Sequence, residues 1–220
     1  MSRGKHTIAP RLRLACIRRW PSDEARSWAE RELNALVEEH SLLAAVAIGS
    51  AVRPASHSAD VDFVLIYKQS KPSLNSVPID VDVRLYRGSE VENLLNKGNE
   101  LLGWAVRFGQ VVYEKDSYWS ELVRRWRERV LLPDARTAIE RAHRAESLSK
   151  DLAAVGDDAA AEEQRLTMLT HLARARLVEA GVFPASREEL VDQLTTIGER
   201  QLAELLARCL ASRMESPKTS

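Results

Sequence analysis

The sequence predicts an α+β fold in which a small mixed β-sheet with flanking helices is followed by an all-helical C-terminal bundle. Up to about residue 130, short apolar segments rich in β-branched residues lie between segments with helical spacing, which is typical of such a sheet. After Pro133 every segment is Ala-rich and has helical spacing. We therefore expect a first domain over residues 1–130 and a helical bundle over residues 131–215.

The first helix is expected to begin at Ser22 or Asp23, both good N-cap residues, directly after Pro21. Apolar residues then recur at helical spacing up to Val37, so we expect one amphipathic helix that ends near His40. The preceding residues 1–20 carry six basic side chains and no acidic one. We expect them to form a basic, partly frayed arm; an organelle transit segment has a similar composition and is the less favoured interpretation.

Four strands are expected in the first domain, over residues 43–48, 61–67, 79–86 and 111–113. Residues 89–108 return to helical spacing with a break at Gly98 or Gly103, and another helix begins at Asp116 or Ser117. In the second domain we expect helices near 135–155, 158–180, 187–196 and 198–213. The last residues, 216–220, are expected to be disordered.

Composition and charge exclude several classes of protein. The chain has 32 basic and 32 acidic residues, so its formal net charge of zero argues against a dedicated, non-specific nucleic-acid binder. Its two cysteines, Cys16 and Cys209, are too few for a disulfide scaffold. The apolar run 42–48 is far shorter than the roughly 20 residues that a membrane span needs. We therefore expect a soluble, cytoplasmic protein that does not bind membranes.

Acidic residues at the start of two expected strands are the strongest functional signal. Asp60 and Asp62 are two positions apart, so their side chains project to the same side of a strand. Asp80 and Asp82 have the same relation in the next strand. Neighbouring carboxylates repel each other, and such a pair suits a hard divalent cation such as Mg²⁺. A solvated strand face is the less favoured alternative, because aspartate is rare in strands.

An anion-binding element is expected beside these carboxylates. Gly49 follows a buried strand and lets the backbone approach a ligand closely, while Ser50 adds a hydroxyl to the exposed backbone N–H groups. Arg53 has a planar guanidinium that suits phosphate. A simple turn at Ser50 and a surface ion pair at Arg53 are the alternatives.

The combined pattern resembles the nucleotidyltransferase superfamily that includes DNA polymerase β. The residues that carry the resemblance are Gly49-Ser50, then, after nine residues, Asp60-Val61-Asp62, and finally Val81-Asp82-Val83. The motif covers residues 46–84, and the wider likeness reaches about residue 130. The small bacterial members, namely the minimal and the aminoglycoside-type nucleotidyltransferases, are the most similar. Pro54 departs from the pattern, since many members have Gly there.

The resemblance implies a nucleotidyltransferase fold, a reaction and a set of site residues. A nucleoside monophosphate, with AMP from ATP as the first choice, would be transferred to a hydroxyl with release of pyrophosphate. Two Mg²⁺ ions would be bound by the catalytic residues Asp60, Asp62 and Asp82. The phosphates of the nucleoside triphosphate would be held by Gly49, Ser50 and Arg53. Asp80, on the same face of the strand, is the alternative to Asp82.

The acceptor is expected to be a small molecule with a hydroxyl group, such as an aminoglycoside-like antibiotic. A tRNA or protein acceptor, as in toxin–antitoxin systems, is the alternative within the class. Two rival classes are a non-catalytic nucleotide-binding scaffold and a helical ribonuclease of the HEPN type. The Arg–His spacing of HEPN ribonucleases is similar to that of Arg165 with His171 and to that of Arg136 with His143. The arginines of residues 124–129 are expected to form a solvated helical face rather than a surface that steers a triphosphate or tRNA.

Overall fold

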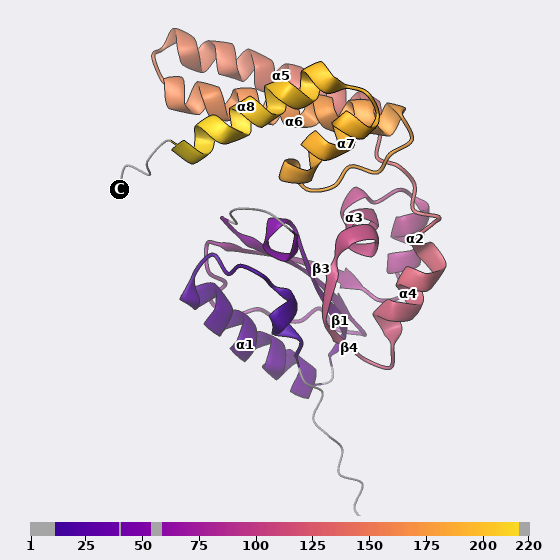
Figure 1. The fold of residues 1–220 in the computed structure, drawn as a ribbon. Helices are drawn as coiled ribbons and strands as arrows, with labels where there is room; N and C mark the ends of the chain where they lie inside the picture. The colour runs from indigo at the N-terminus through magenta and orange to yellow at the C-terminus, as the bar shows by residue number, and fades with distance from the viewer. Residues whose placement is uncertain (1–11, 40, 54–58, 216–220) are drawn as a thin grey trace, which may run out of the picture. The chain divides into compact units, whose positions relative to one another are not determined.

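The computed structural model describes residues 12–39, 41–53 and 59–215, and the chain divides into two compact units, Met1–Leu131 and Leu132–Ser220 (Figure 1). The first unit contains a four-stranded mixed sheet with flanking helices, and the second is helical. The predicted α+β fold class is therefore confirmed. Pro54 and the expected tail over 216–220 lie outside the described residues.

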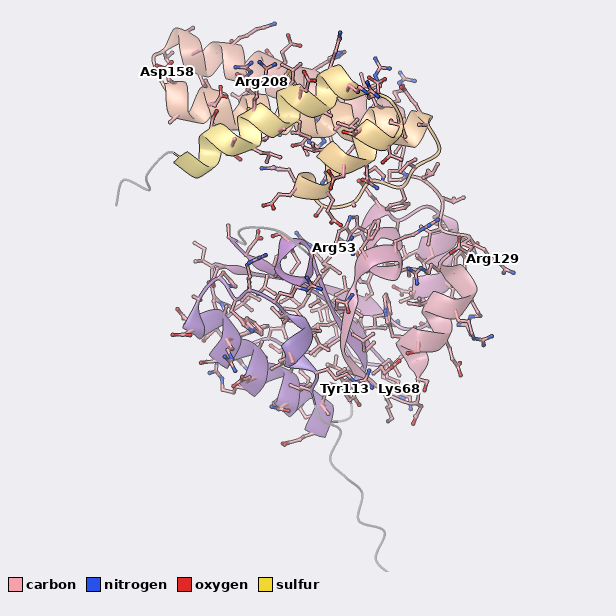
Figure 2. All side chains as sticks on the ribbon, viewed as in Figure 1. Arg53, Lys68, Tyr113, Arg129, Asp158 and Arg208 are labelled. Carbon is pink, nitrogen blue, oxygen red and sulfur yellow. The ribbon has the colours of Figure 1, made fainter. Side chains whose placement is uncertain are left out.

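The sheet has the strand order β3-β2-β1-β4. Its strands are β1 (Leu42–Ile48), β2 (Val61–Tyr67), β3 (Val81–Arg87) and β4 (Gln110–Glu114). β1 is antiparallel to both β2 and β4, whereas β2 and β3 are parallel. The C-terminal end of β1 and the N-terminal ends of the other three strands therefore share one end of the sheet. In Figure 2 Arg53 marks this end, and Lys68 and Tyr113 mark the opposite end.

Helix α1 (Asp23–Glu38) covers one face of the sheet (Figure 1). It begins at the expected N-cap Ser22, whose Oγ accepts a hydrogen bond from the backbone N–H of Ala25 at 3.0 Å. Its buried side packs around Trp28, which is 1% exposed and contacts Phe63 of β2. The regular spacing of apolar residues thus produces one buried helix face, as predicted.

The connection between β2 and β3 is held against α1. Trp28 Nε1 donates a hydrogen bond to the carbonyl of Asn75 at 2.8 Å, and the backbone N–H of Asn75 donates to the buried Glu32 carboxylate at 3.0 Å. A parallel strand pair requires such a crossover, because a tight turn can only join antiparallel strands. These contacts therefore help to place β3 beside β2.

Three helices pack on the opposite face of the sheet: α2 (Val91–Asn96), α3 (Glu100–Phe108) and α4 (Tyr118–Trp126) (Figure 1). The expected break in the helical segment falls at Gly98, whose φ of +74° is left-handed. Asn99 then caps α3 by accepting a hydrogen bond from the backbone N–H of Leu102 at 3.0 Å.

Residues 12–20 of the expected basic arm are packed rather than frayed. The backbone N–H of Arg13 donates to the carbonyl of Val112 at 2.7 Å along the outer edge of β4, before the short 3₁₀ helix η1 (Leu14–Cys16). Ile17 is buried, and the N–H of Arg18 donates to the carbonyl of Ala51 at 2.9 Å. The segment therefore covers part of an otherwise exposed strand edge.

The second unit consists of α5 (Ala135–Ala154), α6 (Asp158–Glu179), the short 3₁₀ helix η3 (Arg187–Glu189), α7 (Leu190–Thr196) and α8 (Arg200–Glu215). α6, α7 and α8 share a core that includes Leu177, Leu194 and Leu206. Ser186 and Glu189 form a capping box at the start of η3. Over the described ranges, no helix has the length and apolar character that crossing a membrane requires.

Candidate functional site

The three predicted aspartates lie at the end of the sheet where β1 stops and β2 and β3 begin. Asp62 is the second residue of β2, and it is in register with Asp82 of β3 and with Ile48 of β1. Asp60 directly precedes β2, and its side chain is exposed. Adjacent positions in parallel strands carry their side chains on the same face, so Asp62 and Asp82 project together. The structure thus brings the three carboxylates into one region.

The environment of Asp62 shows that these carboxylates interact. Its pKa is raised from an ordinary value of 3.8 to about 6, first by burial and then by the negative charges of Asp60 and Asp82. Arg84 opposes this shift, because its positive charge favours the ionised form. A bound cation would act in the same direction as Arg84 and with a larger charge. The site is therefore electrostatically suited to a divalent cation.

Gly49 packs directly against the Asp62 carboxylate. Its φ is +80°, in the left-handed region that side chains rarely adopt, and a Cβ added there would lie 2.5 Å from Asp62 Oδ2. A side chain at position 49 would therefore force the Asp62 carboxylate to shift. This contact places the Gly49-Ser50 bend beside the acidic residues.

Gly49→Ala is expected to destabilise the protein by about 1–3 kcal/mol, since it adds both backbone strain and a clash with Asp62. Gly156→Ala is the matched control, because Gly156 has a similar φ of +83° but would place no Cβ within 4 Å of another group. Urea denaturation measures both variants, and we expect Gly49→Ala to lose more stability, because its ψ of −164° and the clash with Asp62 both add to the strain of a positive φ. An equal loss of stability in both variants would show that Asp62 is not held against Gly49.

Asp82 has a basic neighbour on its own strand. Arg84 Nη2 donates a hydrogen bond to Asp82 Oδ2 at 2.8 Å, and the two side chains are 60% and 45% exposed. An ion pair this exposed contributes at most about 1 kcal/mol. Within the described ranges, no three His, Cys, Asp or Glu side chains are grouped so as to hold a metal ion. Because the Arg84 guanidinium is hydrogen-bonded to Asp82 Oδ2, a cation bound at this oxygen would take the place of the guanidinium.

Asp80 lies apart from this group, so the expectation that it shares a face with Asp82 is wrong. Its Oδ2 accepts a hydrogen bond from Ser22 Oγ at 2.5 Å, at the N-terminus of α1. The reason is that β3 begins at Val81, so the alternation of a strand does not extend back to residue 80. Asp80 instead connects the start of β3 to the cap of α1.

The predicted phosphate-binding residues follow β1 directly. Ser50 opens the short 3₁₀ helix η2 (Ser50–Val52), and its carbonyl accepts a hydrogen bond from the N–H of Arg53 at 3.1 Å. The guanidinium carbon of Arg53 lies 5.0 Å from the centre of the Phe108 ring, a cation–π contact. Arg53 is thus oriented toward the junction of α3 and β4.

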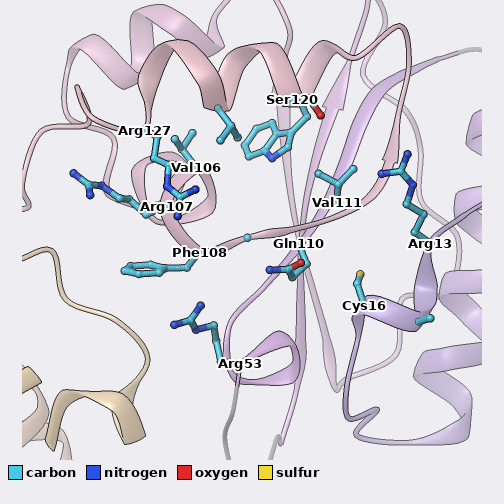
Figure 3. Close-up of a pocket in the computed structure, with 14 residues that line it drawn as sticks. Arg13, Cys16, Arg53, Val106, Arg107, Phe108, Gln110, Val111, Ser120 and Arg127 are labelled. Carbon is cyan, nitrogen blue, oxygen red and sulfur yellow. The ribbon is translucent and has the colours of Figure 1, made fainter. Parts of the chain in front are cut away.

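A pocket of about 640 Å³ opens at this junction (Figure 3). Its walls come from η1, from Arg53, from the end of α3 and the start of β4, and from α4. None of the three aspartates lines it. Sequence analysis did not find this pocket, because no motif connects its basic residues Arg13, Arg53, Arg107 and Arg127.

The Arg–His pairs expected of a ribonuclease are not supported by the contacts of the second unit. Arg165 lies 3.6 Å from the Glu162 carboxylate, and Arg136 lies 3.3 Å from that of Glu140. The pKa of His171 is lowered to about 4, first by burial and then by four other arginines: Arg174, Arg141, Arg187 and Arg144. His171 is therefore neutral near pH 7.

A comparison with protein-family models gives no match, and a comparison with curated proteins gives none. Among solved structures, the chain is similar to a nucleotidyltransferase-like protein from Exiguobacterium sibiricum, with 15% sequence identity and a TM-score of 0.38. The match covers 87% of this chain and 68% of that chain.

Proposed function

We propose that the protein is a Mg²⁺-dependent nucleotidyltransferase that transfers a nucleoside monophosphate, with AMP from ATP as the first choice, to a hydroxyl of a small-molecule acceptor. The observation that carries this proposal is that Asp60, Asp62 and Asp82 lie at one end of the sheet, beside the Gly49-Ser50 bend, and interact electrostatically. Burial first, and then the charges of Asp60 and Asp82, raise the pKa of Asp62 to about 6, and a bound cation would offset this cost of ionisation.

The donor set fits Mg²⁺, because carboxylate oxygens are the ligands that this ion prefers. Under the proposal Asp60 and Asp62 hold two ions, and Asp82 completes the set after Arg84 has been displaced. Bound Mg²⁺ would supply positive charge that activates a hydroxyl and stabilises the leaving oxygen. The protein's own contribution is to hold these carboxylates in place at one end of the sheet.

The remaining residues bind and orient the substrates. The backbone at Gly49 and the Ser50 hydroxyl would hold the β- and γ-phosphates, and Arg53 would add positive charge. Asp82 would accept the proton of the acceptor hydroxyl. A bond then forms between the acceptor oxygen and the α-phosphorus, the bond from that phosphorus to the bridging oxygen breaks, and pyrophosphate leaves. Alignment of the reacting groups supplies much of the rate enhancement.

The proposal is tested by incubating the full chain with Mg²⁺, each nucleoside triphosphate in turn and a metabolite extract, followed by mass spectrometry. We expect a product heavier than its acceptor by one nucleoside monophosphate, strongest with ATP, and no product with Asp60→Ala. Parallel reactions with aminoglycosides test one kind of small-molecule acceptor. Reactions with tRNA and with protein test the alternative acceptor classes. Failure to form any adduct would contradict the proposed transfer.

The Asp82–Arg84 ion pair favours one second candidate, a scaffold that binds a nucleotide without turnover. In a scaffold Arg84 would keep its bond to Asp82, and a triphosphate would bind at the Gly49-Ser50 bend alone. Nucleotide binding that is unchanged by Mg²⁺ and by Asp62→Asn, together with no adduct in the mass spectra, would support the scaffold.

A further inference from the structure

The pocket between η1, the α3–β4 junction and α4 has a strongly one-sided charge. Four of its lining residues are arginines, and the lining residues, all in the described part of the chain, include no Asp or Glu. Converging arginines repel each other, so a pocket of this kind is suited to an anionic ligand. Guanidinium groups bind phosphate oxygens through paired N–H donors.

Three of these arginines gather at one end of the pocket. Figure 3 shows Arg53, Arg107 and Arg127 around Phe108, with Arg13 at the opposite end. Arg13 has an acidic neighbour at 3.9 Å, Glu114, which also accepts hydrogen bonds from Ser120. Three of the four arginines that line the pocket therefore lie at the Phe108 end.

Apart from the polar residues Gln110 and Ser120, the rest of the lining is mostly apolar, and the pocket has more room than inorganic phosphate needs. Val106, Val111 and Val123 form much of the wall, with the Phe108 ring beside the arginines. A volume of about 640 Å³ falls within the range of pockets that hold small organic molecules, about 300–1,000 Å³. The expected ligand thus has an anionic end and an organic body.

The pocket lies beyond the phosphate-binding bend, on the side away from the aspartates. β4 is next to β1, whereas β2 and β3, which carry the acidic residues, lie on the other side of β1. Arg53 connects the two regions, because it follows Ser50 by three residues and also lines the pocket. The pocket and the acidic group are therefore separate sites at the same end of the sheet.

We propose that this pocket is a binding site for an organic phosphate, with the phosphate held by Arg53, Arg107 and Arg127 and the organic body against Phe108 and the valines. The phosphate can belong to the nucleotide, with its phosphate chain extending past Ser50, or to a second phosphate-bearing molecule such as the acceptor. Binding of an organic phosphate in this pocket does not depend on the proposed reaction. A role for the pocket in catalysis does rest on the proposed function.

The test uses phenyl phosphate and inorganic phosphate as probes, titrated into the metal-free full chain in EDTA at low salt and followed by ¹H–¹⁵N NMR. Phenyl phosphate is expected to bind about tenfold more tightly than inorganic phosphate, because only it contacts the apolar wall. Arg107→Gln and Arg127→Gln should each weaken phenyl phosphate binding about tenfold. Because Arg127 is exposed, its variant tests the site without disturbing the core.

Two controls locate the site. Arg124→Gln removes an exposed arginine from the same helix outside the pocket, and it should leave binding unchanged. Asp62→Asn should also leave phenyl phosphate binding unchanged, since the aspartates lie outside the pocket. Equal weakening in the Arg124 and Arg127 variants, equal affinity for the two probes, or no binding of either probe would overturn the proposal.

A competition experiment then identifies the source of the phosphate. If saturating phenyl phosphate displaces metal-free ATP, the pocket holds the phosphate chain of the nucleotide. If both bind together, the pocket serves a second phosphate-bearing molecule, and the acceptor class becomes anionic rather than aminoglycoside-like. Either result supports the site. Failure of the nucleotidyl-transfer assay with these binding results intact would overturn the reaction and not the pocket.

Discussion

Asp62→Asn is expected to remove nucleotidyl transfer and at the same time to stabilise the fold at neutral pH. Under the proposed function Asp62 binds Mg²⁺, so its loss should remove several kcal/mol of transition-state stabilisation, which corresponds to a fall in kcat/KM of about a thousandfold or more. The stabilisation arises because Asp62 is half-buried and lies near two other carboxylates. A functional residue that costs stability is typical of an active site.

The pH dependence of this stabilisation follows from the raised pKa of Asp62. The folded state binds the proton with a pKa of about 6, and the unfolded state with one near the ordinary value of 3.8. Ionisation therefore costs the folded state free energy above pH 6, and the cost disappears as the pH falls below about 4. After allowance for partial solvent exposure, we expect Asp62→Asn to gain about 1–2 kcal/mol at pH 7 and almost nothing at pH 4.

Urea denaturation at pH 7.5, 6 and 4 measures this difference, in parallel with the adduct assay at pH 7.5. Asp151→Asn, an exposed aspartate on α5, is the control and should change neither stability nor transfer. A destabilised Asp62→Asn at pH 7.5, or one that retains full transfer, would show that Asp62 does not have the role assigned to it.

Asp82→Asn and Asp80→Asn are expected to have opposite effects. Asp82→Asn should lower kcat/KM at least a hundredfold with little change in stability, because its ion pair with Arg84 is largely exposed. Asp80→Asn should keep kcat/KM within about threefold of wild type and lose about 1–2 kcal/mol of stability, because it weakens a hydrogen bond between Ser22 and a carboxylate.

Steady-state kinetics and urea denaturation of both variants separate the two roles. The comparison of these two variants is informative because the two aspartates are only two residues apart and both are replaced by asparagine. If Asp80→Asn lost activity as strongly as Asp82→Asn, the assignment of Asp80 to the α1 cap would fail. If Asp82→Asn kept its activity, the third carboxylate would have to be sought elsewhere.

Much of the fold is predictable because local chemistry and tertiary packing agree. β2 coincides with its predicted range, since a run that is apolar except for Asp62 has few alternatives to a buried strand. β3 begins at Val81 rather than at Ile79, which is fully exposed, so apolar character alone misplaced the strand end. The helix breaks at Gly98 rather than at Gly103 because Asn99 caps α3. The spacing of apolar residues gives no information about this cap.

The candidate site was only partly predictable from the sequence. The i, i+2 spacing of Asp60 and Asp62 and the adjacent Gly49-Ser50 are local features, and the motif contains them. The hydrogen bond from Ser22 to Asp80 joins residues 58 positions apart and depends on tertiary structure. The arginine pocket likewise collects residues from four separate segments. Arg127, expected to lie on a solvated helical face, lines the pocket because α4 packs beside the α3–β4 junction.

Titration with Mn²⁺ followed by electron paramagnetic resonance tests the central claim most directly, because it measures cation binding without requiring the acceptor to be known. The full chain, Asp62→Asn and Asp151→Asn are compared at pH 7.5. We expect wild type and Asp151→Asn to bind Mn²⁺ with the same affinity and Asp62→Asn to bind it at least tenfold more weakly. Equal Mn²⁺ binding by all three proteins would contradict a divalent-cation site at these aspartates.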